Sequence, residues 1–553
     1  MLSRLFSFQG GIHPDSHKQE SRDAPIRQAP LPERLTIPLA QSAGKTARPV
    51  VAVGDKVLKG ERIGAADDWI SASVHASTSG RVLDIAPCPM PHPSGLAALS
   101  VVIEPDGEER WIEREPVAYE KLSPEEVFRC LQEFGIVGLG GAVFPSHVKL
   151  KAALRATEDL ILNGAECEPF ITCDDRLMQE RAGEIVSGIG ILADLLQPRR
   201  VLIAIEENKP EAIRAMRDAV QAADKGFRVA VIPTIYPTGS LKQLIRVLTG
   251  REIPARQLPT DLGVQCFNIA TAFSIWRALH HGEPLIRRVV TLTGNVARPG
   301  NWETAIGTPI GELLALAEPR DDTDGIIMGG PMMGTPLPEQ KAPIIKASNC
   351  LIARSPALFP PRPEMPCIRC GSCARACPQE LQPYELYWWS RARQFERLAD
   401  YHLQDCIECG CCAYVCPANI PLVQYFRFAK GEIRVRAREE KNAEQARERF
   451  EFRQFREARE KAEKAEKLAK AAAAQAAKLA EAREKAEKTA PDAAPASATT
   501  TTAASPEEAG KAAVAAAVAR AHAEPVAQET SPAAPTQETE ARVSGPEKAA
   551  PAS

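Results

Sequence analysis

The feature that most constrains this chain is a cluster of cysteines near residue 400. Nine of the fifteen cysteines fall between Cys367 and Cys416. Thiolates at such short spacing hold iron in [4Fe–4S] cubes, where three come from one run of sequence and the fourth from elsewhere. The cluster contains two copies of one pattern, Cys367-x2-Cys370-x2-Cys373-x3-Cys377-Pro378 and Cys406-x2-Cys409-x2-Cys412-x3-Cys416-Pro417. We therefore predict a two-cluster domain over residues 360–425.

In two-cluster ferredoxins the fourth cysteine of each run ligates the other cluster. Zinc is the alternative metal, but it needs only four ligands and rarely shows this cysteine–proline pattern twice, so we favour iron and sulfur. The ninth cysteine, Cys411, fits no ligand position and is expected to be a small buried side chain. The predicted sets are Cys367, Cys370, Cys373 and Cys416 for cluster 1, and Cys377, Cys406, Cys409 and Cys412 for cluster 2.

Composition limits the class of protein and its surroundings. Hydrophobic residues make up 44% and charged residues 25% of the chain, as in ordinary globular proteins. A net charge of −3 argues against a nucleic-acid binder. The first residues, MLSRLFSFQGG, lack the apolar core of a signal peptide, and no run approaches the ~18 apolar residues of a membrane span. We expect a reducing cytoplasm, where clustered cysteines bind metal.

Periodicity and turn residues divide the rest of the chain. Residues 1–30 are polar and irregular, and residues 31–115 show short β-like runs broken by Gly and Pro, which predicts a small barrel or sandwich. Residues 120–282 alternate helical patterns with short apolar strands, which predicts a parallel sheet with helices on its faces. Residues 285–355 return to short strands around Gly/Pro-rich turns.

The C-terminal part is polar throughout. Residues 431–489 repeat the Glu-to-Lys spacing of Glu460 and Lys464, which predicts a solvated single helix of roughly 90 Å. Residues 490–553 are Ala/Pro/Thr/Glu-rich and should be disordered. Within them, 511–522 fits a transient helix, with a partner-binding helix as the alternative.

A glycine-rich loop is a candidate cofactor site. It carries Gly138, Gly140, Gly141, Ala142, Phe144 and Pro145 and precedes a helical pattern. Glycines let backbone N–H groups approach a phosphate, and Lys149 would supply a cation. A second segment holds Asn163, Glu166 and Glu168 directly after an apolar strand, where open α/β sheets bind ligands. The alternative is that both glutamates are simply solvated in a loop.

These two segments resemble the flavin-binding pair GxGGAxFP and NxDExEP in the NADH-oxidising subunit of respiratory complex I. The resemblance assigns to a flavin the glycine-loop residues named above, with Lys149, Asn163, Glu166 and Glu168, and adds Asn268 and Thr271 of FNIAT. Ala165 stands where that family has an aspartate, and residues 236–244 lack its acidic pair near nicotinamide. Flavin binding is thus better supported than NADH binding.

Residues 1–430 also resemble the RnfC family, a component of Rnf-type ion-translocating electron transport complexes, through GGIHP, VHASTSG, YPTGSLKQLIRVLTGREIP, GGPMMG and CIECGCCAYVCP in order. The resemblance implies a multidomain α/β and β chain with a barrel-sandwich-like N-terminal domain, a Rossmann-like flavin domain, a β-grasp module at 285–355 and a two-[4Fe–4S] ferredoxin domain. Barrel-sandwich domains that carry biotin or lipoate need a lysine at a hairpin tip. The sequence has no lysine between Lys59 and Lys121, so we expect a structural role.

The same resemblance implies a peripheral subunit on the cytoplasmic side of the inner membrane, part of an ion-translocating oxidoreductase of the translocase class that requires partner subunits. Its cofactors would be two [4Fe–4S] clusters and FMN, with NADH as a possible substrate and a ferredoxin-level carrier as a further partner. No catalytic residue can be named from the sequence. The alternatives are a soluble flavin/iron–sulfur reductase of cobalamin-reductase type, a flavin-less electron-transfer adaptor, and a scaffold organised by the C-terminal tail.

Overall fold

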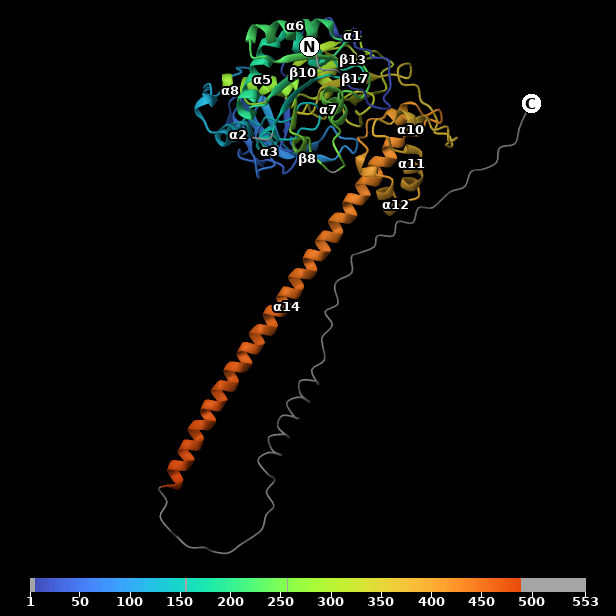
Figure 1. Ribbon diagram of the computed structural model, residues 1–553. Coiled ribbons are helices and arrows are strands. Elements are labelled where there is room, and N and C mark those ends of the chain that lie inside the picture. Colours follow the sequence, from blue (N-terminus) through green and yellow to red (C-terminus); the bar gives the residue numbers. More distant parts are fainter. Residues whose placement is uncertain (1–4, 155–156, 256, 489–553) are drawn as a thin grey trace, which may run out of the picture. The chain divides into compact units, whose positions relative to one another are not determined.

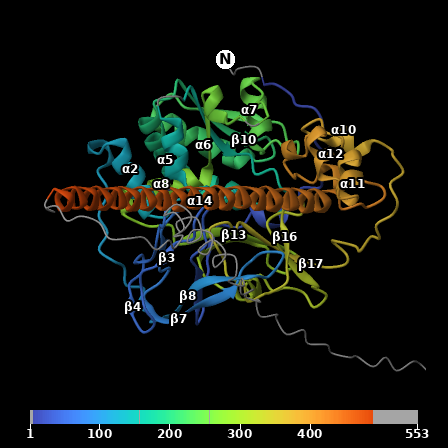
Figure 2. The same cartoon turned by 90° about the horizontal axis from the view of Figure 1, so that it is seen from below.

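The computed structural model describes residues 5–154, 157–255 and 257–488 (Figure 1). Contacts divide the chain into two units, Met1–Gln445 and Ala446–Ser553. The predicted tail 490–553, with its segment 511–522, lies outside the described residues. Figure 2 shows many of the strands on one side of the first unit, while the other side combines most of the helices with further strands.

Two small antiparallel sheets form the N-terminal domain. Alternating residues of the first sheet point inward, as its pairing shows: Leu35 pairs with Ile103 and Ile37 with Val101, and all four side chains are buried. One sheet has the order β2 (Leu35–Pro38), β8 (Ala97–Pro105), β7 (Gly80–Pro89), β4 (Lys56–Val57), and the other β3 (Arg48–Pro49), β5 (Arg62–Ala65), β6 (Val74–His75).

The α/β domain is built on a parallel sheet, as the alternating pattern predicted. The strand order is β11 (Arg228–Ile232), β10 (Arg200–Glu206), β9 (Asp159–Gly164), β12 (Val264–Asn268). The helices are α2 (Pro124–Glu133), α3 (Ser146–Ala153), α4 (Cys173–Glu180), α5 (Ala182–Leu196), α6 (Pro210–Ala223), α7 (Leu241–Thr249) and α8 (Ile269–His281). Along the central strand β9, Leu160 and Leu162 pack on one face with α5, α6 and α8, while Ile161 packs on the other with α7.

A six-stranded sheet follows, and it recruits the N-terminal segment. The segment, predicted to be irregular, forms α1 (Gln19–Arg22) and β1 (Arg27–Gln28), and β1 pairs with β14 through backbone hydrogen bonds. The order is β1, β14 (Gly300–Ala305), β13 (Arg287–Gly294), β17 (Cys350–Arg354), β15 (Gly325–Met328), β16 (Thr335–Leu337), with α9 (Ile310–Ala315) packed beside it.

The cysteine-rich domain consists of short helices closed by the start of a long one. The long helix α14 (Leu422–Glu487) was predicted to begin near Gly431 and begins nine residues earlier, because Val423, Phe426 and Ala429 are buried against Leu386. The short helices are α10 (Ser372–Ala376), α11 (Pro383–Arg391), α12 (Phe395–Asp400) and α13 (Cys411–Tyr414); brief 3₁₀ turns span Tyr119–Lys121, Pro259–Leu262 and Leu403–Asp405. Among the described residues, no helix combines the length and apolar character that a membrane crossing requires.

Candidate functional site

The eight cysteines of the repeated pattern line two separate cavities. One cavity has apolar walls that include Tyr387 and Ile420, and the walls of the other include Leu386 and Phe426. Each cavity thus offers four thiols and little competing polarity, a donor set that suits an iron–sulfur cube. The first is lined by Cys367, Cys370, Cys373 and Cys416, and the second by Cys377, Cys406, Cys409 and Cys412. The structure therefore brings together the members of each predicted set.

The ninth cysteine is buried outside the linings of both cavities, whereas tyrosines of the linker line the first cavity. Cys411 is fully buried, as predicted, with its Sγ 3.9 Å from the carbonyl oxygen of Tyr236. Tyr387 is buried and lines the first cavity. Burial raises the pKa of Cys406 to about 11, so a bound metal is needed to hold this sulfur as a thiolate at neutral pH.

The glycine loop is a closed turn between α2 and α3. The N–H of Gly138 donates to the carbonyl oxygen of Phe144 at 2.8 Å, and the N–H of Val143 donates back to Gly138 at 3.1 Å. Gly141 has a φ of +104°, where an L side chain would be strained. Gly140, Gly141 and Ala142 are exposed. The turn leaves this glycine-rich stretch uncovered, as a phosphate cradle requires.

Two residues of α8 anchor this loop to the sheet. The N–H of Leu139 donates to Thr271 Oγ1 at 2.9 Å, and Thr271 is fully buried. Asn268 caps α8 by accepting from the N–H of Ala270 at 2.9 Å, and its amide donates to Asp174 at 2.6 Å. The family-derived residues Asn268 and Thr271 thus lie against the glycine loop, with an ideal Cβ on Gly140 only 3.5 Å from Asn268 Cβ.

The acidic segment is enclosed rather than solvated. Glu166 accepts from the N–H groups of Asp174 and Asp175, at 2.7 and 3.1 Å, at the start of α4. Asn163 donates to the carbonyl oxygen of Gly239 at 2.8 Å. Burial raises the pKa of Glu166 to about 8. The interpretation of a solvated loop is wrong, because these polar groups are satisfied within the fold.

Glu168 joins three parts of the chain. Its carboxylate accepts from the N–H groups of Met332 and Met333 at 3.2 and 2.9 Å, and from the hydroxyl of Tyr236 at 3.3 Å. Burial raises its pKa to about 7. The Tyr236 hydroxyl also donates to the carbonyl oxygen of Cys409 at 2.6 Å. A single side chain, that of Tyr236, therefore links Glu168 of the acidic segment to Cys409 of the second cysteine set.

Lys149 departs from its expected place. Its ammonium donates to the carbonyl oxygen of Cys266, in the middle of β12, and lies 4.7 Å from the ring centroid of Phe267. Burial lowers its pKa. In the structure, Lys149 therefore contacts strand β12. From the sequence we had expected its ammonium to lie at the glycine loop, as a cation for a phosphate.

Two functional residues escaped the sequence interpretation. Lys18, a buried lysine of the N-terminal segment, donates to the carbonyl oxygens of Glu166, Glu168 and Ile171 at 2.8, 2.8 and 2.5 Å. Tyr236 was noted only as part of a segment lacking acidic residues. The sequence around these two residues does not indicate what they contact. The partners of Lys18, for example, lie about 150 residues away in sequence.

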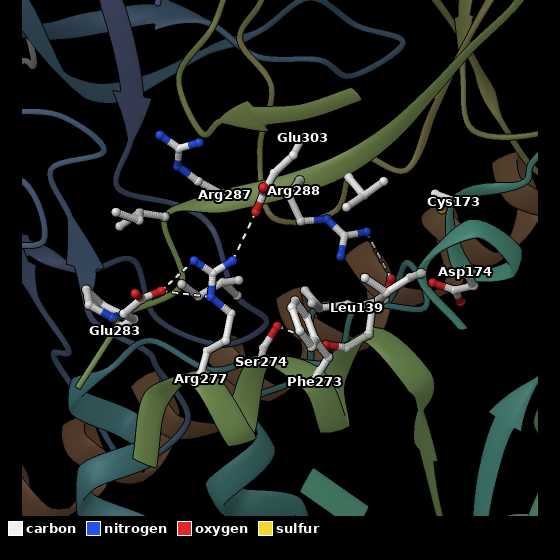
Figure 3. Close-up of a pocket in the computed structure, with 16 residues that line it drawn as sticks. Leu139, Cys173, Asp174, Phe273, Ser274, Arg277, Glu283, Arg287, Arg288 and Glu303 are labelled. Atoms are coloured by element: carbon white, nitrogen blue, oxygen red, sulfur yellow. Dashed lines mark hydrogen bonds and ion pairs between the residues drawn. The ribbon is translucent and has the colours of Figure 1, made fainter. Parts of the chain in front are cut away.

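A pocket lies between α8 and the six-stranded sheet (Figure 3). Arg277 of α8 pairs with Glu283 at 2.7 Å and Glu303 at 2.9 Å. Arg288 points across the pocket and donates to the carbonyl oxygen of Leu139 at 3.3 Å. Arg288 thereby connects the glycine loop to β13, so the loop is held from two domains.

Family models match four stretches of the chain in the same order as these domains. The descriptions are RnfC Barrel sandwich hybrid domain for residues 6–108, Nuo51 FMN-binding domain for 131–277, SLBB domain for 289–336 and 4Fe-4S dicluster domain for 366–420. The chain is thus a flavin and iron–sulfur protein by its domains, and the predicted FMN and [4Fe–4S] cofactors are confirmed at that level.

Curated relatives make the assignment more specific. An RnfC-type subunit of the ion-translocating oxidoreductase complex of Pasteurella multocida is 48% identical over 81% of this chain and 54% of its own length. Its counterpart in Cronobacter sakazakii is 50% identical over 81% of this chain and 58% of its own length. The resemblance to the RnfC family is confirmed, and the chain spans a little over half the length of these relatives.

Among solved structures, an NAD+-reducing [NiFe]-hydrogenase in the air-oxidized state is similar, with 19% identity and a TM-score of 0.40. The match covers 50% of this chain and 54% of that one.

Proposed function

We propose that the chain is the peripheral electron-input subunit of a membrane-bound, ion-translocating oxidoreductase of the translocase class. It would act on the cytoplasmic side of the inner membrane and depend on membrane-embedded and peripheral partner subunits, with NADH and a ferredoxin-level carrier as redox partners. The observation that carries this proposal is a pair of hydrogen-bond contacts of the Tyr236 hydroxyl, one with Glu168 and one with the carbonyl oxygen of Cys409. They fix the flavin-type segment against a cysteine set.

In this proposal the chain's own residues bind, position and shield two kinds of cofactor. The backbone of the loop from Gly138 to Pro145 would hold a flavin phosphate, supported by Thr271 and Asn268. A bound FMN supplies the exchange between two-electron and one-electron chemistry. Asn163, Glu166 and Glu168 shape the adjoining wall through the hydrogen bonds described above, and Lys149 supports β12. We also interpret the parallel sheet as Rossmann-like and residues 285–355 as a β-grasp module.

A flavin-less electron-transfer adaptor is the second candidate, and Lys149 is the observation that favours it. Its ammonium donates to the carbonyl oxygen of Cys266, and this contact supports the adaptor because it occupies the group that the resemblance assigned to a phosphate. A soluble reductase of cobalamin-reductase type is the other alternative; it would share much of this architecture and differ in its partners.

Anaerobic purification followed by iron and flavin analysis tests the proposal. We expect eight iron atoms and one FMN per chain, with the protein in the membrane fraction before a salt wash. Eight iron without FMN would favour the adaptor, and a fully soluble protein without membrane partners would favour the reductase. Thr271→Val should lower the FMN content, whereas Thr249→Val, a matched change on α7, should leave it unaltered.

Paired substitutions test the crossed cysteine sets. Cys377→Ser should remove the same electron paramagnetic resonance signal as Cys406→Ser, although Cys377 belongs to the first run. Likewise Cys416→Ser should match Cys367→Ser. If Cys377→Ser instead matched Cys367→Ser, each run would hold its own cluster and the assignment would be wrong.

A further inference from the structure

The two cysteine runs contain the same turn with different side chains. In each run the third residue has a positive φ, +54° at Arg369 and +57° at Glu408. In each, the N–H of that residue lies 3.4 Å from a cysteine sulfur, Cys367 or Cys406. Because the backbone geometry repeats, the surroundings of one turn can be compared directly with those of the other.

The turn of the second run is an interface inside the chain. The carbonyl oxygen of Cys409 accepts from Tyr236, and Gly410 lies so close to Met332 that a Cβ would come within 2.9 Å of its carbonyl oxygen. Glu408 is paired with Arg427 at 3.1 Å and Lys430 at 3.0 Å. The α/β domain and the six-stranded sheet therefore cover this turn, and its charge is neutralised.

The equivalent turn of the first run is bare. Ile368 is 70% exposed and Cys370, a member of the first cysteine set, is also exposed. Within the described part of the chain, the hydrogen bonds of the Arg375 side chain go to its own turn, to Ser372 at 3.0 Å and to the carbonyl oxygen of Cys370 at 3.3 Å. Among residues 5–488 that the structure describes, neither Arg369 nor Arg375 forms an ion pair with a carboxylate. Ile368 and Arg369 are thus exposed residues in the lining of the first cavity, and the exposed Arg375 hydrogen-bonds to the same turn.

We propose that this turn, Ile368–Ser372 together with Arg375, is the docking surface for an acidic one-electron carrier protein. The inference rests on the proposed function, since it needs a cluster at the first cysteine set. Carboxylates around the carrier's cofactor would pair with Arg369 and Arg375, and an apolar recess would receive Ile368. One electron leaves the reduced cluster and reduces the carrier's oxidised cofactor, with no bond made or broken. The internal use of the second turn shows that this backbone geometry suits a protein interface.

Two haem proteins of opposite charge serve as probes. Ferric cytochrome b5 is acidic and ferric cytochrome c is basic, and both accept one electron. With the full chain loaded with clusters, we expect cytochrome b5 to bind more tightly than cytochrome c, with an affinity that falls as salt screens the charges. The double change Arg369→Glu and Arg375→Glu should weaken cytochrome b5 binding and slow haem reduction by about tenfold at low salt, and strengthen cytochrome c binding. Ile368→Gln should weaken binding without changing the salt dependence.

Arg217→Glu, on the exposed face of α6, is the matched control and should leave both affinities unaltered. The inference is overturned if the double change leaves cytochrome b5 affinity unaltered in protein that retains eight iron atoms and its paramagnetic signals, or if Arg217→Glu weakens binding equally. A wild-type chain without clusters would overturn the proposed function itself, before any probe is added.

Discussion

Lys18 places one ammonium group among three backbone carbonyl oxygens of the acidic segment. Burial lowers its pKa, while the carboxylate of Glu166 acts in the opposite direction. Residues of this kind are beyond sequence reasoning, because a lysine in a polar segment normally faces water. The cysteine sets could be predicted, since their spacing is local and their chemistry is specific.

We expect Lys18→Met to destabilise the α/β domain by roughly 3 kcal/mol, because three buried carbonyl groups lose their donor. The thermal unfolding midpoint and the FMN content should both fall. Lys56→Met, at an exposed lysine of β4, is the control. An unchanged thermal unfolding midpoint in the Lys18 variant would mean that water satisfies the three carbonyl oxygens with no loss of stability.

Glu168 should make stability pH-dependent. Burial raises its pKa from 4.5 to about 7, so the folded state holds the proton more tightly than the unfolded state. Its stabilising contribution is complete below pH 4.5 and is lost as pH rises through 7, by roughly 3 kcal/mol. Glu168→Gln should flatten the unfolding free energy between pH 5 and 8, and Glu339→Gln, at an exposed site, should not. A slope that persists in the Glu168 variant would assign the effect to Glu166, whose pKa is raised in the same direction.

At the scale of elements, α14 combines two environments in one helix. Its first turns are buried in the cysteine-rich domain, while its residues from Arg434 to Ala486 are exposed. The sequence predicted the exposed part from its charge repeat and placed the start at Gly431. Helical propensity cannot locate such a boundary, because tertiary packing around Phe426 outweighs the ~1 kcal/mol that a glycine costs within a helix.

Truncation separates the two parts of α14. A chain ending at residue 445 should retain eight iron atoms and its thermal stability, because it keeps every buried residue of the helix. A chain ending at residue 421 should lose both clusters, since Leu422 lines the first cavity and Val423 and Phe426 line the second. Loss of iron in the longer truncation would show that the exposed helix supports the clusters after all.

At the scale of the whole molecule, the second cysteine set is more deeply buried within the first unit than the first cysteine set is. Cys409 and Cys412 are buried, whereas Cys370 of the other set is exposed. The order of the domains was predictable from composition and motifs. The contact of residues 236–244 with the cysteine-rich domain was not, because the bond from Gln243 to the carbonyl oxygen of Pro378 joins residues 135 positions apart.

This asymmetry predicts a stepwise loss of iron. During mild treatment with an iron chelator or oxygen, the set containing Cys370 should lose its cluster first, because solvent reaches it directly. The iron count should pause near four per chain while the paramagnetic signal removed by Cys406→Ser persists. Loss of both signals at one rate would contradict the difference in exposure.

The N-terminal segment also bears on how the molecule is made. The N–H of Gly11 donates to the carbonyl oxygen of Ala376, and Ile12 pairs with Tyr236. On the ribosome the first of these partners emerges long after Gly11, some 20 to 70 seconds at ~5–20 residues per second. The segment around Gly11 is therefore synthesised long before the partner that fixes it, and it can reach its final place only once the cysteine-rich domain has been made.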